Sequence, residues 1–203
     1  MGQTREKLLQ VAVEMFGRNG FHAIGLDAVI EAAGVSKQTF YNHFESKDDL
    51  VLATLELRRD MERKLFARLF NELAGNDPRR CLYATVDVIQ AWFRQPDWKG
   101  CIFIRAASEF PSPNDPAHQI AAAWFEENRQ QMQNMATLAG ARDPAKLSMQ
   151  VTTLLEGVIN VRHITGSESG VALAREMLHE LLDRELPVSS NQQSGTGFRA
   201  DVA

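Results

Sequence analysis

Apolar residues recur three and four positions apart along almost the whole of this sequence, and runs of alternating β-branched residues are absent. That interval is the period of an amphipathic helix, whereas a half-buried strand alternates every second residue. The 203 residues, 44% of them apolar, suffice for one sizeable core or for a small domain attached to a larger one. We therefore predict an all-α protein with nine helices.

Capping and helix-breaking residues set the expected helix boundaries. Thr4 is expected to cap the first helix, Asn19-Gly20 to end it, and residues 75–78 to close the long fourth helix. This organisation predicts an N-terminal three-helix head (residues 1–50), a helical body (residues 51–186) that the fourth helix joins to it, and a disordered polar tail (residues 187–203). The predicted helices cover about residues 4–19, 26–33, 37–43, 47–73, 79–94, 101–109, 116–139, 144–165 and 168–186.

A turn at residues 33–36 joins two short segments with helical apolar spacing. Gly34 can adopt the positive φ of a tight interhelical turn, and Ser36 can cap the helix that follows. With Ser36 as N-cap, Val35 and Phe40 have the spacing of a hydrophobic staple, so Val35, Phe40 and Phe44 should face inward. This pattern predicts a helix-turn-helix, whose second helix enters the major groove of DNA.

The residues left outward on that second helix have the chemistry that base recognition needs. Gln38 can pair with adenine N6 and N7, Lys37 with guanine or a phosphate, and the Thr39 methyl with a thymine methyl. Phosphate contacts are expected from Tyr41, His43 and Lys47, the last at the N-terminus of the next helix. The alternative is that this is only the polar face of a surface helix. The outward set is Lys37, Gln38, Thr39, Tyr41, Asn42 and His43.

The whole stretch resembles the TetR family of transcriptional regulators over about residues 4–55. Its motifs here are Gly20-Phe21, Ala32-Ala33-Gly34-Val35-Ser36 and Tyr41-Asn42-His43-Phe44-Glu45-Ser46-Lys47. The resemblance implies an all-helical homodimer whose C-terminal ligand-binding and dimerisation body takes a small-molecule effector that shifts the spacing of the two heads. The family usually has Thr or Ser where this chain has Ile24-Gly25, so one phosphate contact is either lost there or replaced by the backbone amides of the Gly25-Leu26 turn.

The charge balance is a point against strong nucleic-acid binding. The net charge is −4, and residues 1–50 hold five Lys and Arg against seven Asp and Glu. Non-specific affinity follows the number of phosphates that a protein neutralises. DNA binding by this chain therefore depends on where its few cations are placed.

Aromatic and polarizable side chains are concentrated between residues 92 and 135, on helices that the family uses for effector binding. A largely apolar effector site with a few polar anchors would follow, although such stripes are also typical of an ordinary core. Glu109 and Arg105 are further candidate anchors. The expected effector residues are Trp92, Phe93, Phe103, Phe110, Trp124, Glu156 and His163.

The last two predicted helices carry apolar stripes that suit packing against another helix. The first stripe includes Leu147, Val151 and Leu155, and the second includes Leu173 and Leu182. These stripes could form an internal core or a homodimer interface. Periodicity alone does not separate the two.

Other functional classes find little support in the sequence. Gly166–Gly170 has Glu168 where a nucleophile elbow needs serine, and Asp183 replaces the second histidine of a zinc helix, so neither an enzyme nor a metal site or cofactor is expected. A helical protein-interaction adaptor or a transcriptional activator remains an alternative to a repressor. Cys101 is expected to be inert, with redox sensing as the alternative. No membrane span or secretory signal is expected, so the chain should stay in the cytoplasm.

Overall fold

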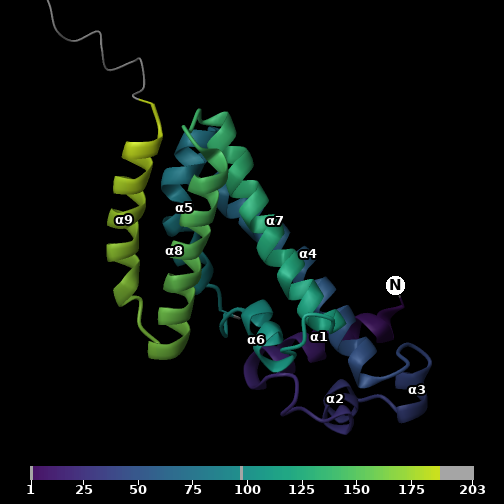
Figure 1. Ribbon diagram of the computed structural model, residues 1–203. Helices are drawn as coiled ribbons and strands as arrows, with labels where there is room; N and C mark the ends of the chain where they lie inside the picture. Colours follow the sequence, from purple (N-terminus) through teal and green to yellow (C-terminus); the bar gives the residue numbers. More distant parts are fainter. Residues whose placement is uncertain (1, 97, 188–203) are drawn as a thin grey trace, which may run out of the picture.

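The computed structural model describes residues 2–96 and 98–187, and within them the chain forms helices and no strands. Figure 1 shows the first three helices at one end of the molecule and the last two at the other, with α4 and α7 running between them. The described elements are α1 (Gln3–Asn19), α2 (Leu26–Ala33), α3 (Lys37–Tyr41), α4 (Lys47–Ala74), α5 (Pro78–Phe93), α6 (Ile102–Glu109), α7 (Pro116–Leu138), α8 (Pro144–Thr165) and α9 (Ser169–Glu185). The all-α prediction is confirmed.

Two predicted boundaries need correction. Thr4 does not cap α1, because the helix begins one residue earlier and Gly2 is its N-cap, with the Gly2 carbonyl accepting from the amides of Arg5 and Glu6. The third helix ends at Tyr41 and not at His43, because the His43 amide bonds the carbonyl of Phe40 in a tighter turn. Apart from Pro187, the predicted tail lies outside the described residues.

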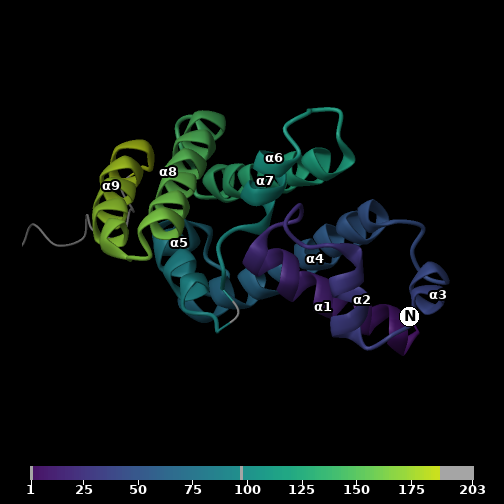
Figure 2. The same ribbon diagram turned by 90° about the horizontal axis from the view of Figure 1, so that it is seen from below.

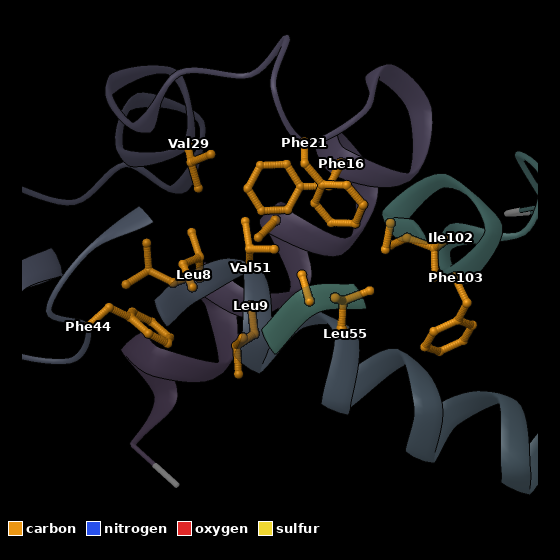
Figure 3. Close-up of a cluster of buried hydrophobic side chains, with 14 of the residues drawn as sticks. Leu8, Leu9, Phe16, Phe21, Val29, Phe44, Val51, Leu55, Ile102 and Phe103 are labelled. Atoms are coloured by element: carbon orange, nitrogen blue, oxygen red, sulfur yellow. The ribbon is translucent and has the colours of Figure 1, made fainter. Parts of the chain in front are cut away.

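The head core combines aliphatic side chains with four phenylalanines of the first helices and the turns between them. Phe16, Phe21, Phe40 and Phe44 are all buried, and the Phe16 and Phe21 rings lie 5.3 Å apart between centroids. Figure 3 shows that this cluster also takes side chains from α4 and α6, including Val51, Leu55, Ile102 and Phe103. The start of α4 and most apolar side chains of α6 are therefore packed onto the head, whereas Ile104 of α6 packs against the body core.

The body core lies among α5, α7, α8 and α9. The two predicted apolar stripes are only partly buried in it. Leu147 and Val151 of α8 and Leu182 of α9 are buried in this core. Leu173 and Met177 of α9 are instead exposed, by 60% and 49%. Figure 2 shows α8 and α9 side by side at the end of the molecule remote from α3.

Ion pairs fix α4 against α7. The guanidinium groups of Arg59 and Arg63 on α4 both donate to the Glu127 carboxylate on α7, and the Arg63 contact measures 2.7 Å. These pairs are partly exposed, so they orient the two helices more than they stabilise them. Within the described residues, no helix is both long enough and apolar enough to cross a membrane.

Candidate nucleic-acid interface and effector cavity

The turn before α3 has the geometry that its sequence predicts. Gly34 adopts φ +63°, its amide bonds the carbonyl of Glu31 at 2.9 Å, and the Val35 amide bonds the carbonyl of Ile30 at 3.2 Å. The Ser36 hydroxyl then accepts the Thr39 amide at 3.0 Å and caps α3. Glycine is required at the left-handed position, because a Cβ there is strained.

The inward face of α3 is held by a staple and an aromatic stack. Phe40 is fully buried, Phe44 nearly so, and their ring centroids lie 5.6 Å apart in a stacked arrangement. Val35 is half-buried against the same core. The guanidinium of Arg5 lies 4.9 Å from the Phe44 ring, which ties α1 to the end of the motif. The predicted inward orientation of these three side chains is confirmed.

The predicted reading residues of α3 lie on its outer face. Lys37, Gln38, Tyr41 and Asn42 are exposed. The Gln38 amide donates to the Asn42 carbonyl oxygen at 3.3 Å, which pairs the two amide side chains on one face. Thr39 and His43 are half-buried, and the Thr39 hydroxyl shares a 2.8 Å hydrogen bond with Ser36.

Asp27 of α2 is a partner that the sequence reasoning missed. Its carboxylate lies 2.8 Å from the Lys37 ammonium, and this hydrogen bond and charge raise the pKa of Lys37. Both groups are well exposed, so the pair adds little stability. Asp27 therefore competes with any base or phosphate for the Lys37 ammonium.

Two helix N-termini flank α3. Ser46 caps α4 by accepting the Asp49 amide at 3.0 Å, and the Asp49 carboxylate accepts the Glu45 amide in return, which places Lys47 at the first helical position. Gly25 is the N-cap of α2 and supplies no side-chain cap. The first amides of α2 therefore have no side-chain acceptor from their cap residue.

The side chains of Glu109 and Phe110, at the end of α6, contact the head, while the Phe110 carbonyl is hydrogen-bonded to His118 of α7. The Glu109 carboxylate accepts the amides of Phe21 and His22 at 2.8 Å each, and the His22 ring bonds the Glu109 carbonyl. The Phe110 ring lies 5.6 Å from that of Phe21. The expectation that Glu109 anchors an effector is therefore wrong, because its carboxylate oxygen is used to hold the turn after α1.

A cavity of about 70 Å³ lies among α4, α5, α7 and α8. Three of the predicted effector residues line it, namely Trp92, Trp124 and Glu156. Sequence reasoning missed the contribution of α4 and most of the polar lining, because neither stands out from a helical stripe. The added residues include Glu62, Phe66, Phe70, Thr85, Asn128, Gln131 and Thr152.

The other predicted effector residues lie outside this lining. Phe93 packs beside Trp92 with ring centroids 5.8 Å apart. Phe103 stacks on Trp124 at 5.1 Å from the side of the head core. His163 and Arg105 border a neighbouring hollow, which shares Cys101 and Ile159 with the lining of the cavity. The structure therefore does not bring the seven expected residues together.

Two acidic groups, the buried Glu62 and the half-buried Glu156, dominate the electrostatics of the cavity. The carboxylate of Glu62 is buried and accepts from Arg58 Nε at 2.9 Å. Burial raises the pKa of Glu156. Burial and the charge of Glu62 raise the pKa of the Cys101 thiol, which borders the same cavity. The position of Cys101 at the start of α6 thus does not produce a thiolate, because desolvation outweighs the helix dipole.

Known proteins resemble this chain over both its head and its body. Residues 8–54 match the family model for bacterial regulatory proteins of the tetR family, and residues 78–178 match the tetracyclin repressor-like C-terminal domain. The transcriptional activator FasR of Mycolicibacterium smegmatis is 45% identical over 58 residues, 29% of this chain and 26% of that protein. The transcriptional repressor NemR of Escherichia coli is 26% identical over 106 residues, 52% of this chain and 53% of that protein.

The likeness of fold extends over nearly the whole chain. The crystal structure of a TetR-family transcriptional regulator from Streptomyces coelicolor superposes with a TM-score of 0.82 at 24% identity, covering 90% of this chain and 95% of that one. The matches to FasR and NemR, by contrast, span about a quarter and a half of those proteins. Two family models that cover the head and most of the body, with the helix-turn-helix geometry described above, place this chain in the TetR family of transcriptional regulators.

Proposed function

We propose that this protein is a homodimeric repressor that binds a palindromic operator in the cytoplasm and is released by a small-molecule effector bound in the body. The observation that carries the proposal is the short helix α3, whose polar residues are exposed while Phe40 and the adjoining Phe44 anchor it in the head core. An exposed polar face on a rigidly held helix is what major-groove readout requires.

The proposed DNA contacts divide into base and phosphate contacts. Gln38 on α3 and Asn42 directly after it are exposed and have the amide groups that pair with adenine, while Lys37 exchanges Asp27 for guanine or a phosphate. Tyr41, His43, Lys47 and the amides that follow Gly25 contact phosphates and fix the register.

Exposed apolar side chains on the last two helices support a homodimer. Within the described residues, nine large apolar side chains are exposed, and five of them lie on α8 and α9. A surface of that kind favours burial against a second copy. The five are Met149, Val161, Ile164, Leu173 and Met177.

The size of the cavity supports a mechanism of effector release. Small-molecule sites usually measure about 300–1,000 Å³, whereas this cavity measures about 70 Å³, so an effector must move the surrounding helices apart. One wall is α4, which begins beside α3, and Cys101 at the start of α6 also borders the cavity while Glu109 at its end holds the head. An effector that prefers the expanded body therefore changes the placement of the heads and weakens operator binding.

Activation is the second candidate, because FasR is an activator and NemR a repressor. The position of the operator relative to the promoter decides between activation and repression, and the head binds the operator in both cases. A transcription assay with the operator placed upstream of, or across, the promoter separates the two.

A nuclease footprint on the DNA flanking the gene tests the proposal. We expect protection of an inverted repeat with half-sites about 34–36 Å apart. Gln38→Ala should weaken discrimination at one base pair by about 1–3 kcal/mol. Lys47→Ala should weaken binding to all DNA sequences alike and reduce the slope of log affinity against log salt concentration by about 1.

The matched control is Lys64→Ala, which removes the same charge from an exposed position of α4 outside the head. It should leave the footprint unchanged. If genome-wide selection of bound DNA by the folded protein yields no site, the chain is a protein-interaction adaptor and the proposal is wrong.

A further inference from the structure

One wall of the body cavity is a set of neighbouring aromatic rings from three helices. The Phe66 ring of α4 lies 5.7 Å from the Trp92 ring of α5 and 6.3 Å from the Trp124 ring of α7, measured between centroids. The last pair is close to parallel, at 21° between planes. Such a wall offers π faces to a ligand, and these attract apolar groups and cations alike.

The charge of the cavity lining has one sign. Sixteen residues line it, and the only charged ones are the carboxylates of Glu62 and Glu156. Arg58 balances Glu62 with its 2.9 Å hydrogen bond. Within the described residues, no basic side chain forms an ion pair with Glu156, so its negative charge is not balanced locally when it is ionised.

Two buried polar atoms of the cavity lining have no hydrogen-bond partner among the residues that the structure describes. They are Nε1 of Trp92 and Oγ1 of Thr152, which both belong to residues that line the cavity and are at least nine-tenths buried. Thr152 lies one turn before Glu156, so the two share a face of α8. Unsatisfied buried polar groups are costly, which makes them expected ligand contacts.

We infer that this cavity binds a hydrophobic organic cation, with its positive nitrogen at Glu156, its flat apolar part against Phe66, Trp92 and Trp124, and a polar group at Thr152 or the Trp92 N–H. The inference rests on the proposed function in that the ligand of this cavity is the effector. Glu156 thereby sets the ligand class, and the aromatic wall supplies the contact area.

The alternatives fit the lining less well. An anion would meet two carboxylates and no cation among the lining residues. A neutral ligand would leave Glu156 either ionised without a counter-charge or neutral at the cost of binding a proton. A cation instead provides the charge that the buried carboxylate lacks and gains attraction from the ring faces.

Fluorescence titration of the full-length protein with matched probes tests this inference. Trp92 and Trp124 line the cavity and report on its occupancy. The cationic probe is benzyltrimethylammonium, and neopentylbenzene is its uncharged counterpart of the same shape. We expect the cation to bind at least tenfold more tightly, Glu156→Gln to remove that preference, and Glu156→Asp to keep part of it.

Glu72→Gln is the matched control, because it removes the same charge from an exposed position of α4 outside the cavity lining. It should leave both affinities within twofold of the unchanged protein. A cation affinity that Glu156→Gln does not alter, a preference for the uncharged probe, or no binding of either probe would overturn the inference.

The titration contains no DNA, so its outcome is independent of the operator footprint. A protein that prefers the cation but protects no operator keeps the ligand class and loses the proposed function. A protein that protects an operator but shows no preference for the cation loses only the ligand class.

Discussion

At the scale of single residues, Glu156 of the proposed ligand site also affects stability. Burial raises its pKa above the ordinary value of 4.5, so the folded protein holds this proton more tightly than the unfolded chain does. The free energy of unfolding must then fall as the pH rises from about 4.5 to the raised pKa. Glu156→Gln carries no titrating proton, and we expect it to raise the melting temperature at pH 8 but not at pH 4.

Thermal denaturation followed by circular dichroism at the two pH values measures this difference. Glu72→Gln is again the control, and it should not raise the melting temperature at pH 8, because the Glu72 carboxylate is exposed and near Arg68. A lower melting temperature of Glu156→Gln at pH 8 would show that the buried carboxylate is stabilised by its surroundings.

Local spacing explains which residues the sequence could predict. Gly34, Ser36 and Phe40 lie within six positions of each other, so their order along the chain already determines their contacts. The role of Glu109 depends on two partners that lie 87 and 88 residues away, and no rule of local spacing predicts such contacts. Asp27 was missed for a related reason, because its contact with Lys37 depends on the angle between α2 and α3.

At the scale of elements, the end of α6 and the turn after α1 form one contact. Gly20 adopts φ +88°, and a Cβ there would lie 2.5 Å from the Glu109 carboxylate oxygen. Both the backbone conformation and the close approach require glycine. We expect Gly20→Ala to lower the free energy of unfolding by about 1–3 kcal/mol, measured by urea denaturation.

Gly17→Ala is the matched control, because Gly17 lies inside α1 and a Cβ there would meet nothing within 4 Å. It should stabilise the protein by about 0.5–1 kcal/mol. Combining Gly20→Ala with Glu109→Ala separates the two costs, since removing the carboxylate relieves the close approach and leaves the backbone strain. Strictly additive effects would mean that the carboxylate does not constrain Gly20.

At the scale of the whole molecule, the sequence predicted the helices far better than the cavity. Asp77, Asp115 and Asp143 each precede a proline and cap a helix, so the starts of α5, α7 and α8 are encoded locally. Which side chains meet in the body depends on how four helices pack. Phe103 illustrates this. Its ring is buried in the head core and stacks on Trp124, but it does not line the cavity.

The proposed homodimer would use the exposed apolar side chains of α8 and α9. Leu173 is 60% exposed there, and a charge at the centre of a dimer interface would be buried without a partner. We expect Leu173→Glu to convert the dimer to a monomer in sedimentation analysis and to abolish the two-half-site footprint at the same concentration. Met61→Glu, at a 43% exposed position of α4, should leave both unchanged. A dimer that survives Leu173→Glu would place the contact between copies elsewhere, and the exposed apolar side chains of α8 and α9 would then need another partner.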